Sequence, residues 1–234
     1  MSTTTTDRPT TATPQLVRTA RMTGLFYLGL AITGLLGLLL VRNQLFVAGD
    51  PGATLANLTR HEYLARLGIV IEMGVVITQA LVALWFYRLF RGVNSFAAGS
   101  IAAFGLVNAV AILTSAALLA SALDVALDAS LTVNGGAAAT SQLLYVVSGH
   151  LWTIGGIFFG LWLIPMGWLA RESGWMPGVL GWILMVGGVG YVASALLSYL
   201  LPGAGLVATL LTMPATVGEL WMVGYLCVRG VRRH

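Results

Sequence analysis

The chain consists mainly of long apolar segments separated by short polar links. Six such segments stand out, at 22–41, 64–87, 96–123, 143–170, 178–201 and 206–228. At about 1.5 Å per helical residue, each is long enough to cross a hydrocarbon core about 30 Å thick. The strands of a membrane β-barrel would alternate polar and apolar residues, and these segments do not. We therefore predict an all-α polytopic membrane protein, a bundle of six transmembrane helices.

The two ends of the chain differ in composition from this apolar region. Residues 1–17 are rich in Thr and interrupted by Pro, so we expect a disordered arm. A six-helix transmembrane domain is expected at 18–230, and a basic tail at 231–234.

Two of the polar links carry features of their own. After the first segment, turn residues at 49–52 precede ATLANLTRHE, which we expect to form a short helix along the membrane surface. After the third segment, Asp124 and Asp128 are four residues apart and would share a face of a continuing helix. We interpret this pair as a solvated helix end, with a cation site as the alternative.

Composition and charge agree with a membrane protein. The chain is 58% hydrophobic and only 9% charged, whereas a soluble domain is about 25% charged. Its net charge of +4 would suggest nucleic acid as a partner of a soluble protein. Here all 12 basic residues are arginines, and they cluster at the ends of apolar segments, where they orient helices in the bilayer. We therefore expect the lipid bilayer, and no nucleic acid, as a partner.

The arginines also predict the orientation of the chain. Nine of them fall at the chain ends and in the second and fourth loops, namely Arg8, Arg18, Arg21, Arg88, Arg91, Arg171, Arg229, Arg232 and Arg233. The opposite side has Arg42 and Arg60, with Arg66 entering the second segment. By the positive-inside rule, both termini are expected to be cytoplasmic. The compact, all-Arg chain suggests the inner membrane of a bacterium.

Three ionisable residues lie well inside the apolar segments: Glu72, His150 and Glu219. Isolated ionisable groups in lipid are costly, so we expect the three to converge in one interior cluster, with Gln79 and Asn108 as further candidate members. One interpretation is a hydrogen-bonded network that determines how the helices pack, and another is a proton relay. A metal site is a third, but the ligand spacing is not typical of zinc, and bis-His haem ligation would need a second buried His. We therefore predict no metal and no cofactor.

Three other features have simpler interpretations. Glu62 precedes Arg66 by four residues, which favours a helical ion pair over a ligand contact for Arg66. Glycines at 149, 156, 160 and 167 form a small-residue stripe, which we assign to packing within the monomer rather than to a dimer seam. The single cysteine, Cys227, is expected to be a packing residue. A homo-oligomer or a membrane-protein partner stays open.

Several stretches resemble one protein family. They are RMTGLFYLGLAITGLLGLL, RLGIVIEMG, PATVGEL and the long segment from HLWTIGG to GGVGYV around the turn GWMPG. Together they are similar to the bacterial membrane proteins grouped as domain of unknown function 4386 (DUF4386), over about residues 21 to 229. The resemblance implies a multi-span bacterial membrane protein and supplies no catalytic roles. Arg66, Glu72, His150 and Glu219 are among the family-like positions.

Three functional hypotheses follow from the sequence. The first is small-solute or proton-coupled transport through the polar cluster, based on its ionisable groups and on the Gly-rich and Pro-containing last two segments. The second is an intramembrane enzyme that uses Glu72, His150 and Glu219 on a lipid-like substrate. It is less favoured, because no nucleophile elbow, phosphate loop or His-rich metal motif is present. The third is a non-catalytic partner or regulatory subunit. The ligand is not identified by the sequence.

Overall fold

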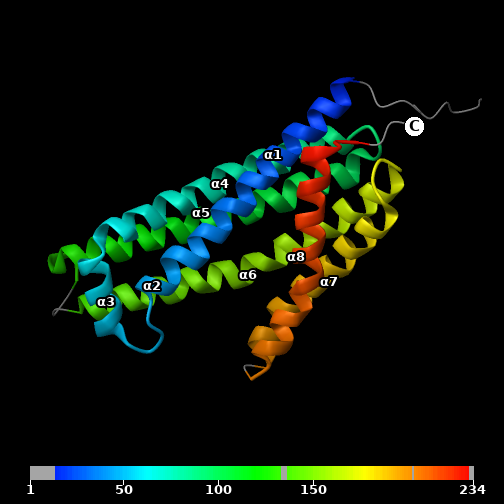
Figure 1. Ribbon diagram of the computed structural model, residues 1–234. Helices are drawn as coiled ribbons and strands as arrows, with labels where there is room; N and C mark the ends of the chain where they lie inside the picture. The colour runs from blue at the N-terminus through cyan, green and yellow to red at the C-terminus, as the bar shows by residue number, and fades with distance from the viewer. Residues whose placement is uncertain (1–13, 133–135, 202, 232–234) are drawn as a thin grey trace, which may run out of the picture.

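The computed structural model describes residues 14–132, 136–201 and 203–231, which form an all-helical bundle (Figure 1). Its helices are α1 (Pro14–Leu36), the π-helical turn η1 (Gly37–Arg42), α2 (Asn43–Leu45), α3 (Pro51–Arg60), α4 (Glu62–Phe90), α5 (Ser95–Leu127), the 3₁₀ turn η2 (Ala129–Leu131), α6 (Ala137–Glu172), α7 (Gly178–Leu200) and α8 (Gly205–Val228). Six of them, α1 and α4 to α8, are long and apolar enough to cross a membrane. The prediction of an all-α bundle of six transmembrane helices is confirmed.

The ends of the bundle differ slightly from the predicted boundaries. Helix α1 begins at Pro14, so 14–17 belong to the helix and not to the expected arm, of which 1–13 lie outside the described residues. Proline suits this position because its fixed φ is helical and the first turn needs no N–H. At the other end, Val231 is only 3% exposed and packs in the core, whereas 232–234 of the expected tail lie outside the described residues.

Two helix starts are determined by side-chain caps. The carboxylate of Asp50 accepts a hydrogen bond from the N–H of Ala53 at 2.9 Å, and Pro51 follows it as the first residue of α3. The side chain of Asn94 caps α5 in the same way, through the N–H of Ala97 at 2.9 Å. The expected short helix between the first two spans is therefore present as α3, which packs against α6.

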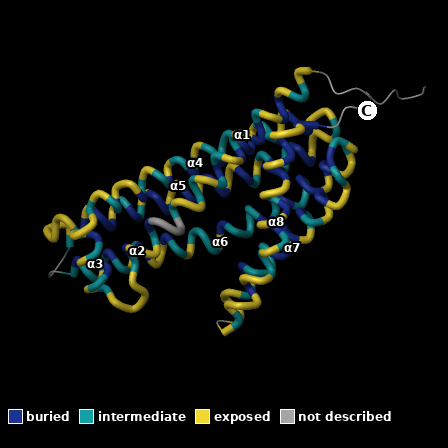
Figure 2. Tube along the Cα trace, in the orientation of Figure 1, coloured by how far each residue is buried: buried dark blue, intermediate teal, exposed yellow. Residues whose placement is uncertain are grey.

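Consecutive long helices run in opposite directions and pack side by side, and α1 lies against α4 and α8 (Figure 1). The buried residues form stripes that face the interior of the bundle, and the outward faces are exposed (Figure 2). The core contains large aromatic side chains, among which Tyr27, Phe86 and Trp162 meet edge to face. Both described ends of the chain lie at the same end of the bundle (Figure 1).

Glycines bring α6, α7 and α8 into close contact. A Cβ atom on Gly160 of α6 would lie 2.5 Å from the carbonyl oxygen of Gly188 in α7, and one on Gly167 would clash with Gly181. Within the described part of the chain, a Cβ on Gly149 would meet nothing within 4 Å, and one on Gly156 would meet only the ring of Tyr191, at 3.8 Å. The predicted glycine stripe therefore serves packing within the monomer at two of its four positions.

Helices α1 and α8 touch closely only near one end. Gly24 of α1 packs against Cys227 of α8, whose backbone N would be 2.8 Å from an added Cβ. Farther along α1, a Cβ on Gly29 would meet Thr78 of α4, and one on Gly34 would meet no described atom within 4 Å. The distance between α8 and α1 thus increases toward the α7–α8 turn (Figure 1). The divergence leaves a wedge between the two helices, and the candidate site lies there.

Candidate functional site

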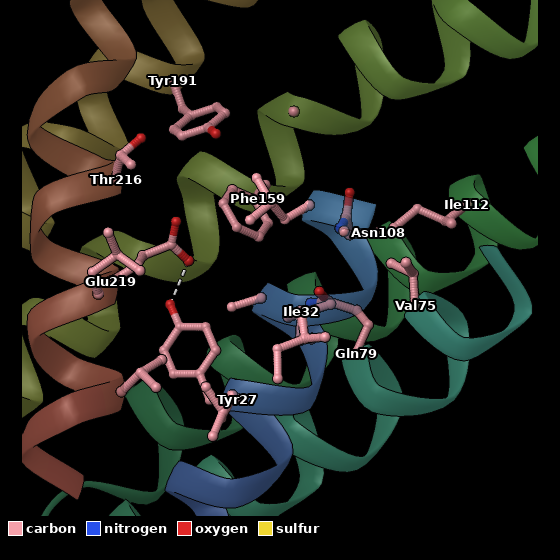
Figure 3. A pocket seen from close by; sticks show the side chains of 18 of the residues that line it. Tyr27, Ile32, Val75, Gln79, Asn108, Ile112, Phe159, Tyr191, Thr216 and Glu219 are labelled. Atoms are coloured by element: carbon pink, nitrogen blue, oxygen red, sulfur yellow. Dashed lines mark hydrogen bonds between the residues drawn. The ribbon is translucent and has the colours of Figure 1, made fainter. Parts of the chain in front are cut away.

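A cavity of about 550 Å³ occupies the wedge, with walls from α1 and α4 to α8 (Figure 3). Ile32 of α1 and Leu220 of α8 line it and are also 49% and 62% exposed on the outside of the bundle, so they border its opening. Because both helices are membrane-spanning candidates, an opening between them faces the acyl chains of the bilayer. A lipid-soluble molecule can therefore reach the cavity sideways from the membrane.

Glu219 of α8 is the acidic group of this cavity. Its Oε1 accepts a hydrogen bond from the hydroxyl of Tyr27 in α1, so one contact joins the two helices where they begin to separate (Figure 3). Thr216, one turn before Glu219, and Tyr191 of α7 also line the cavity. Oε2 of Glu219 has no hydrogen-bond partner among the described residues. The carboxyl group is thus held by Tyr27 through one oxygen, while the other is free to bind a ligand.

Two amide side chains line another part of the cavity (Figure 3). Gln79 of α4 is 0% exposed, and neither its Nε2 nor its Oε1 has a hydrogen-bond partner within the described part of the chain. Asn108 of α5 is nearly as buried, and its Oδ1 would be 3.2 Å from a Cβ on Gly155, so glycine there leaves room for the amide. A buried amide without partners costs about 1–3 kcal/mol, so the Gln79 amide favours a polar group in the cavity.

Glu72 of α4 belongs to a different, tightly bonded polar group. Its Oε2 accepts a hydrogen bond from Ser115 Oγ of α5 at 2.9 Å, and its Oε1 accepts one from Trp152 Nε1 of α6 at 3.2 Å. Ser115 Oγ lies 2.7 Å from Ser148 Oγ, and Arg42 donates to Ser148 Oγ. Four elements (η1, α4, α5 and α6) are therefore joined through hydrogen bonds.

The direction of these hydrogen bonds follows from the chemistry of the groups. A guanidinium has donors only, so Ser148 accepts from Arg42 and uses its own proton to donate to Ser115. Ser115 in turn donates to Glu72. Every bond in this chain, which we call the Arg42–Glu72 chain, points from the cation to the carboxylate. A fully oriented chain of this kind stabilises the two charges and holds the helices together.

Trp152 connects the two polar regions. Its indole N–H donates to Glu72, while its side chain also lines the cavity. A molecule that displaces the Trp152 ring would therefore disturb the hydrogen bonding of Glu72.

His150 does not join either group. His150 is exposed, and its Nδ1 lies 2.8 Å from the hydroxyl of Tyr199 in α7. The reason is helical geometry: Ser148 and Trp152 are four residues apart and share the inward face of α6, whereas His150 lies between them on the opposite side. The expected convergence of Glu72, His150 and Glu219 is thus not what the structure shows, because each has different hydrogen-bond partners.

The remaining acidic and basic candidates lie outside the cavity. Arg66 Nε is 2.7 Å from Glu62 Oε1, and these side chains are 57% and 44% exposed, which confirms the predicted helical ion pair. Asp128 follows the last residue of α5 as its C-cap, and hydrogen bonds from the side chain and the backbone N–H of Ser130 lower its pKa below the ordinary value. No three His, Cys, Asp or Glu residues in the described ranges are grouped so as to hold a metal ion.

Sequence reasoning missed the five residues that hydrogen-bond to the acids or along the Arg42–Glu72 chain in these two sites: Tyr27, Arg42, Ser115, Ser148 and Trp152. Arg42 was counted only as a topological charge. The signal that was present is the spacing of Ser148 and Trp152, which are one helical turn apart in an otherwise apolar segment. For Tyr27 and Ser115 the sequence offers no comparable signal, because single hydroxyl groups are common in membrane helices.

One comparison with known proteins identified a family. The family described as "Domain of unknown function (DUF4386)" matches residues 22–230, which is nearly the whole chain and the same region as the resemblance in the sequence. No curated protein and no solved structure gave a match.

Proposed function

We propose a function from the geometry of the cavity. The chain belongs to the family described as a domain of unknown function (DUF4386), and that description assigns no activity. In this proposal the integral membrane protein binds a small, membrane-soluble molecule in the cavity between α1 and α8. The molecule enters from the bilayer, its apolar body contacts the aromatic and aliphatic walls, and its polar group meets Glu219 and Gln79.

The observation that carries this proposal is a cavity of ligand size that contains an unpartnered buried amide. A volume of about 550 Å³ lies within the range of small-molecule sites, about 300–1,000 Å³. Such sites combine mainly apolar walls with a few polar groups, as here. An apolar side chain would serve better at this position if Gln79 were used only for packing, because its fully buried amide has no hydrogen-bond partner among the described residues.

We place this protein in the inner membrane of a bacterium, with both termini in the cytoplasm. Two observations support that orientation. The described chain ends lie together with the α4–α5 and α6–α7 loops at one end of the bundle (Figure 1). That end has Arg18, Arg21, Arg88, Arg91, Arg171 and Arg229, and arginines favour the cytoplasmic side.

Native mass spectrometry of the protein purified in lipid nanodiscs tests the binding function. We expect a co-purified small molecule in the unmodified protein, and its loss in Gly156→Leu, where the new side chain projects into the cavity. Gly149→Leu is the matched control, because it lies two turns away on the same helix, outside the cavity lining and with no neighbour within 4 Å. Equal retention of the molecule in both variants would contradict the proposal.

Proton-coupled transport is the second candidate function, favoured by the carboxyl group inside a cavity that opens to the membrane. Its test is a flux assay in liposomes with an imposed pH gradient, in which Glu219→Gln should abolish solute movement. Absence of flux for solutes that bind would leave binding as the function. An intramembrane enzyme using Glu72, His150 and Glu219 together is not proposed, because the three have different partners.

A further inference from the structure

The charge of the cavity narrows the class of ligand. Of the side chains that line it in the described part of the chain, Glu219 is the one acid, and none is an arginine, lysine or histidine. Tyr27, Tyr191 and Thr216 contribute hydroxyl groups to the lining, rather than positive charge. An anionic ligand would thus meet no opposite charge, whereas a cation would meet a carboxyl group.

The aromatic walls favour the same sign of charge. Four aromatic side chains line the cavity, from α1, α6 and α7: Tyr27, Trp152, Phe159 and Tyr191. Phe159 and Tyr191 are in edge contact, with ring centroids 5.1 Å apart. The face of an aromatic ring is negative and attracts a cation that lies against it, more strongly when water is excluded. Several rings around one carboxyl group are therefore a suitable environment for an organic cation.

The amides add oxygen atoms without adding charge. Within the ranges that the structure describes, Gln79 Oε1 has no hydrogen-bond partner, and Glu219 Oε2 accepts no hydrogen bond. Both can accept a hydrogen bond from an N–H group or lie against a diffuse positive charge. At the same time, the opening between Ile32 and Leu220 admits molecules that are already dissolved in the bilayer.

We propose that the cavity binds a lipophilic organic cation, such as an amine or onium ion with an aromatic or aliphatic body, with Glu219 as the counter-charge. This inference rests on the proposed binding function and specifies its ligand class. The cation enters between α1 and α8, and its charge comes to rest between Glu219 and the aromatic rings. Tyr27 keeps the carboxyl group in place through Oε1 and leaves Oε2 for the ligand.

Three probes of one shape separate charge from hydrophobicity: tetraphenylphosphonium, tetraphenylsilane and tetraphenylborate carry one positive charge, no charge and one negative charge. Saturable binding of labelled tetraphenylphosphonium is measured on the protein in nanodiscs, with empty nanodiscs as the background. We expect the neutral and the negative compound to compete poorly. If either competes as well as unlabelled tetraphenylphosphonium, or if no saturable binding occurs, the inference about the ligand class is overturned.

Variants of Glu219 then test whether this residue is the counter-charge of the bound cation. We expect Glu219→Gln to weaken tetraphenylphosphonium binding by about tenfold or more, since it removes the counter-charge and keeps the shape. Glu219→Asp should retain part of the affinity, which shows that a loss in Glu219→Gln does not arise from misfolding. Glu62→Gln, at an exposed acid, is the control and should bind normally. Full binding by Glu219→Gln would overturn the ligand class.

The Gly156→Leu variant distinguishes a wrong ligand class from a wrong binding site. If Gly156→Leu abolishes binding while Glu219→Gln does not, the cavity binds the probe, but the charge of Glu219 does not determine which ligands bind. If Gly156→Leu also binds the cation normally, the probe does not occupy the cavity, and both the ligand class and the proposed site are refuted.

Discussion

Arg42 and Glu72 stand at the two ends of a chain of hydrogen bonds that passes through Ser148 and Ser115, so their opposite charges are connected without a direct ion pair. Arg42 is the last residue of the π-helical turn that follows α1, and the other three lie in α6, α5 and α4. A π-helical turn changes the register of the residues after it, and such turns are frequent at functional positions. The Arg42–Glu72 chain thereby attaches the end of α1 to the middle of the bundle.

A double-mutant cycle measures whether these charges act together. Arg42→Gln and Glu72→Gln should each destabilise the protein, because each leaves the other charge partly buried without its counter-charge. We expect the double variant to lose less stability than the sum, with a coupling energy of about 1–3 kcal/mol. The measurement is the free energy of unfolding from SDS titration in mixed micelles.

The control for this cycle is the exposed pair Glu62 and Arg66, which is in direct contact at 2.7 Å. Because solvent screens that pair, its coupling should be below about 1 kcal/mol despite the shorter distance. Equal coupling energies for the two pairs would show that the serine-mediated connection couples its charges no more strongly than an exposed ion pair does.

The serines of the chain give a second prediction. Ser115→Ala removes the proton that Glu72 Oε2 accepts and the oxygen to which Ser148 donates. We expect a loss of about 1–3 kcal/mol, because buried polar groups are left unpaired. In the same helix, the exposed Ser121 bonds only to the carbonyl of Ala117, so Ser121→Ala should change the free energy of unfolding by less than about 0.5 kcal/mol. Similar losses in both variants would contradict the assignment.

The fold was predictable because the bilayer imposes a simple rule on sequence. Long apolar segments must be helical to satisfy their backbone hydrogen bonds, so the number of helices follows directly from the number of such segments. The Glu62–Arg66 pair was predictable for a similar reason, since it depends only on spacing along one helix.

The site was less predictable, because it depends on which way each helix is rotated. Glu72, His150 and Glu219 all lie well inside apolar segments, but position along a helix does not determine direction around the helix axis. The hydrophobic pattern of a membrane helix carries little of that information, because a lipid-facing side is as apolar as a buried one. His150 therefore pairs with Tyr199 on the outside of α6, while the inconspicuous Ser148 and Trp152 face inward.

Close packing of α6 against α7 gives a third prediction. Gly160→Ala places a methyl group 2.5 Å from the carbonyl oxygen of Gly188, so the helices must separate. We expect a loss of about 1–3 kcal/mol in the free energy of unfolding from overpacking. Gly149→Ala, in the same helix and with no neighbour within 4 Å, should be neutral or slightly stabilising. If both variants unfold alike in SDS titration, the two helices are not in close contact at Gly160.

The orientation in the membrane is tested by labelling single cysteines in intact cells. On a Cys227→Ser background, Gly52→Cys in α3 and Gly92→Cys in the α4–α5 loop report on opposite ends of the bundle, and both positions are exposed. With cytoplasmic termini, a membrane-impermeant maleimide should label Gly52→Cys in whole cells and Gly92→Cys only after lysis. The reverse pattern would show that the arginine-rich end faces outward.

The hydrogen bond between Tyr27 and Glu219 gives the final prediction. Tyr27→Phe keeps the ring in its aromatic contacts with Phe86 and Trp162 and removes only the hydroxyl that Glu219 accepts. We expect a loss of about 1–3 kcal/mol in the free energy of unfolding, together with weaker ligand binding because the carboxyl group is no longer oriented. Tyr87→Phe, at a half-exposed position outside the cavity lining, is the matched control and should affect neither quantity. Unchanged stability and binding in Tyr27→Phe would mean that this hydrogen bond does not position Glu219.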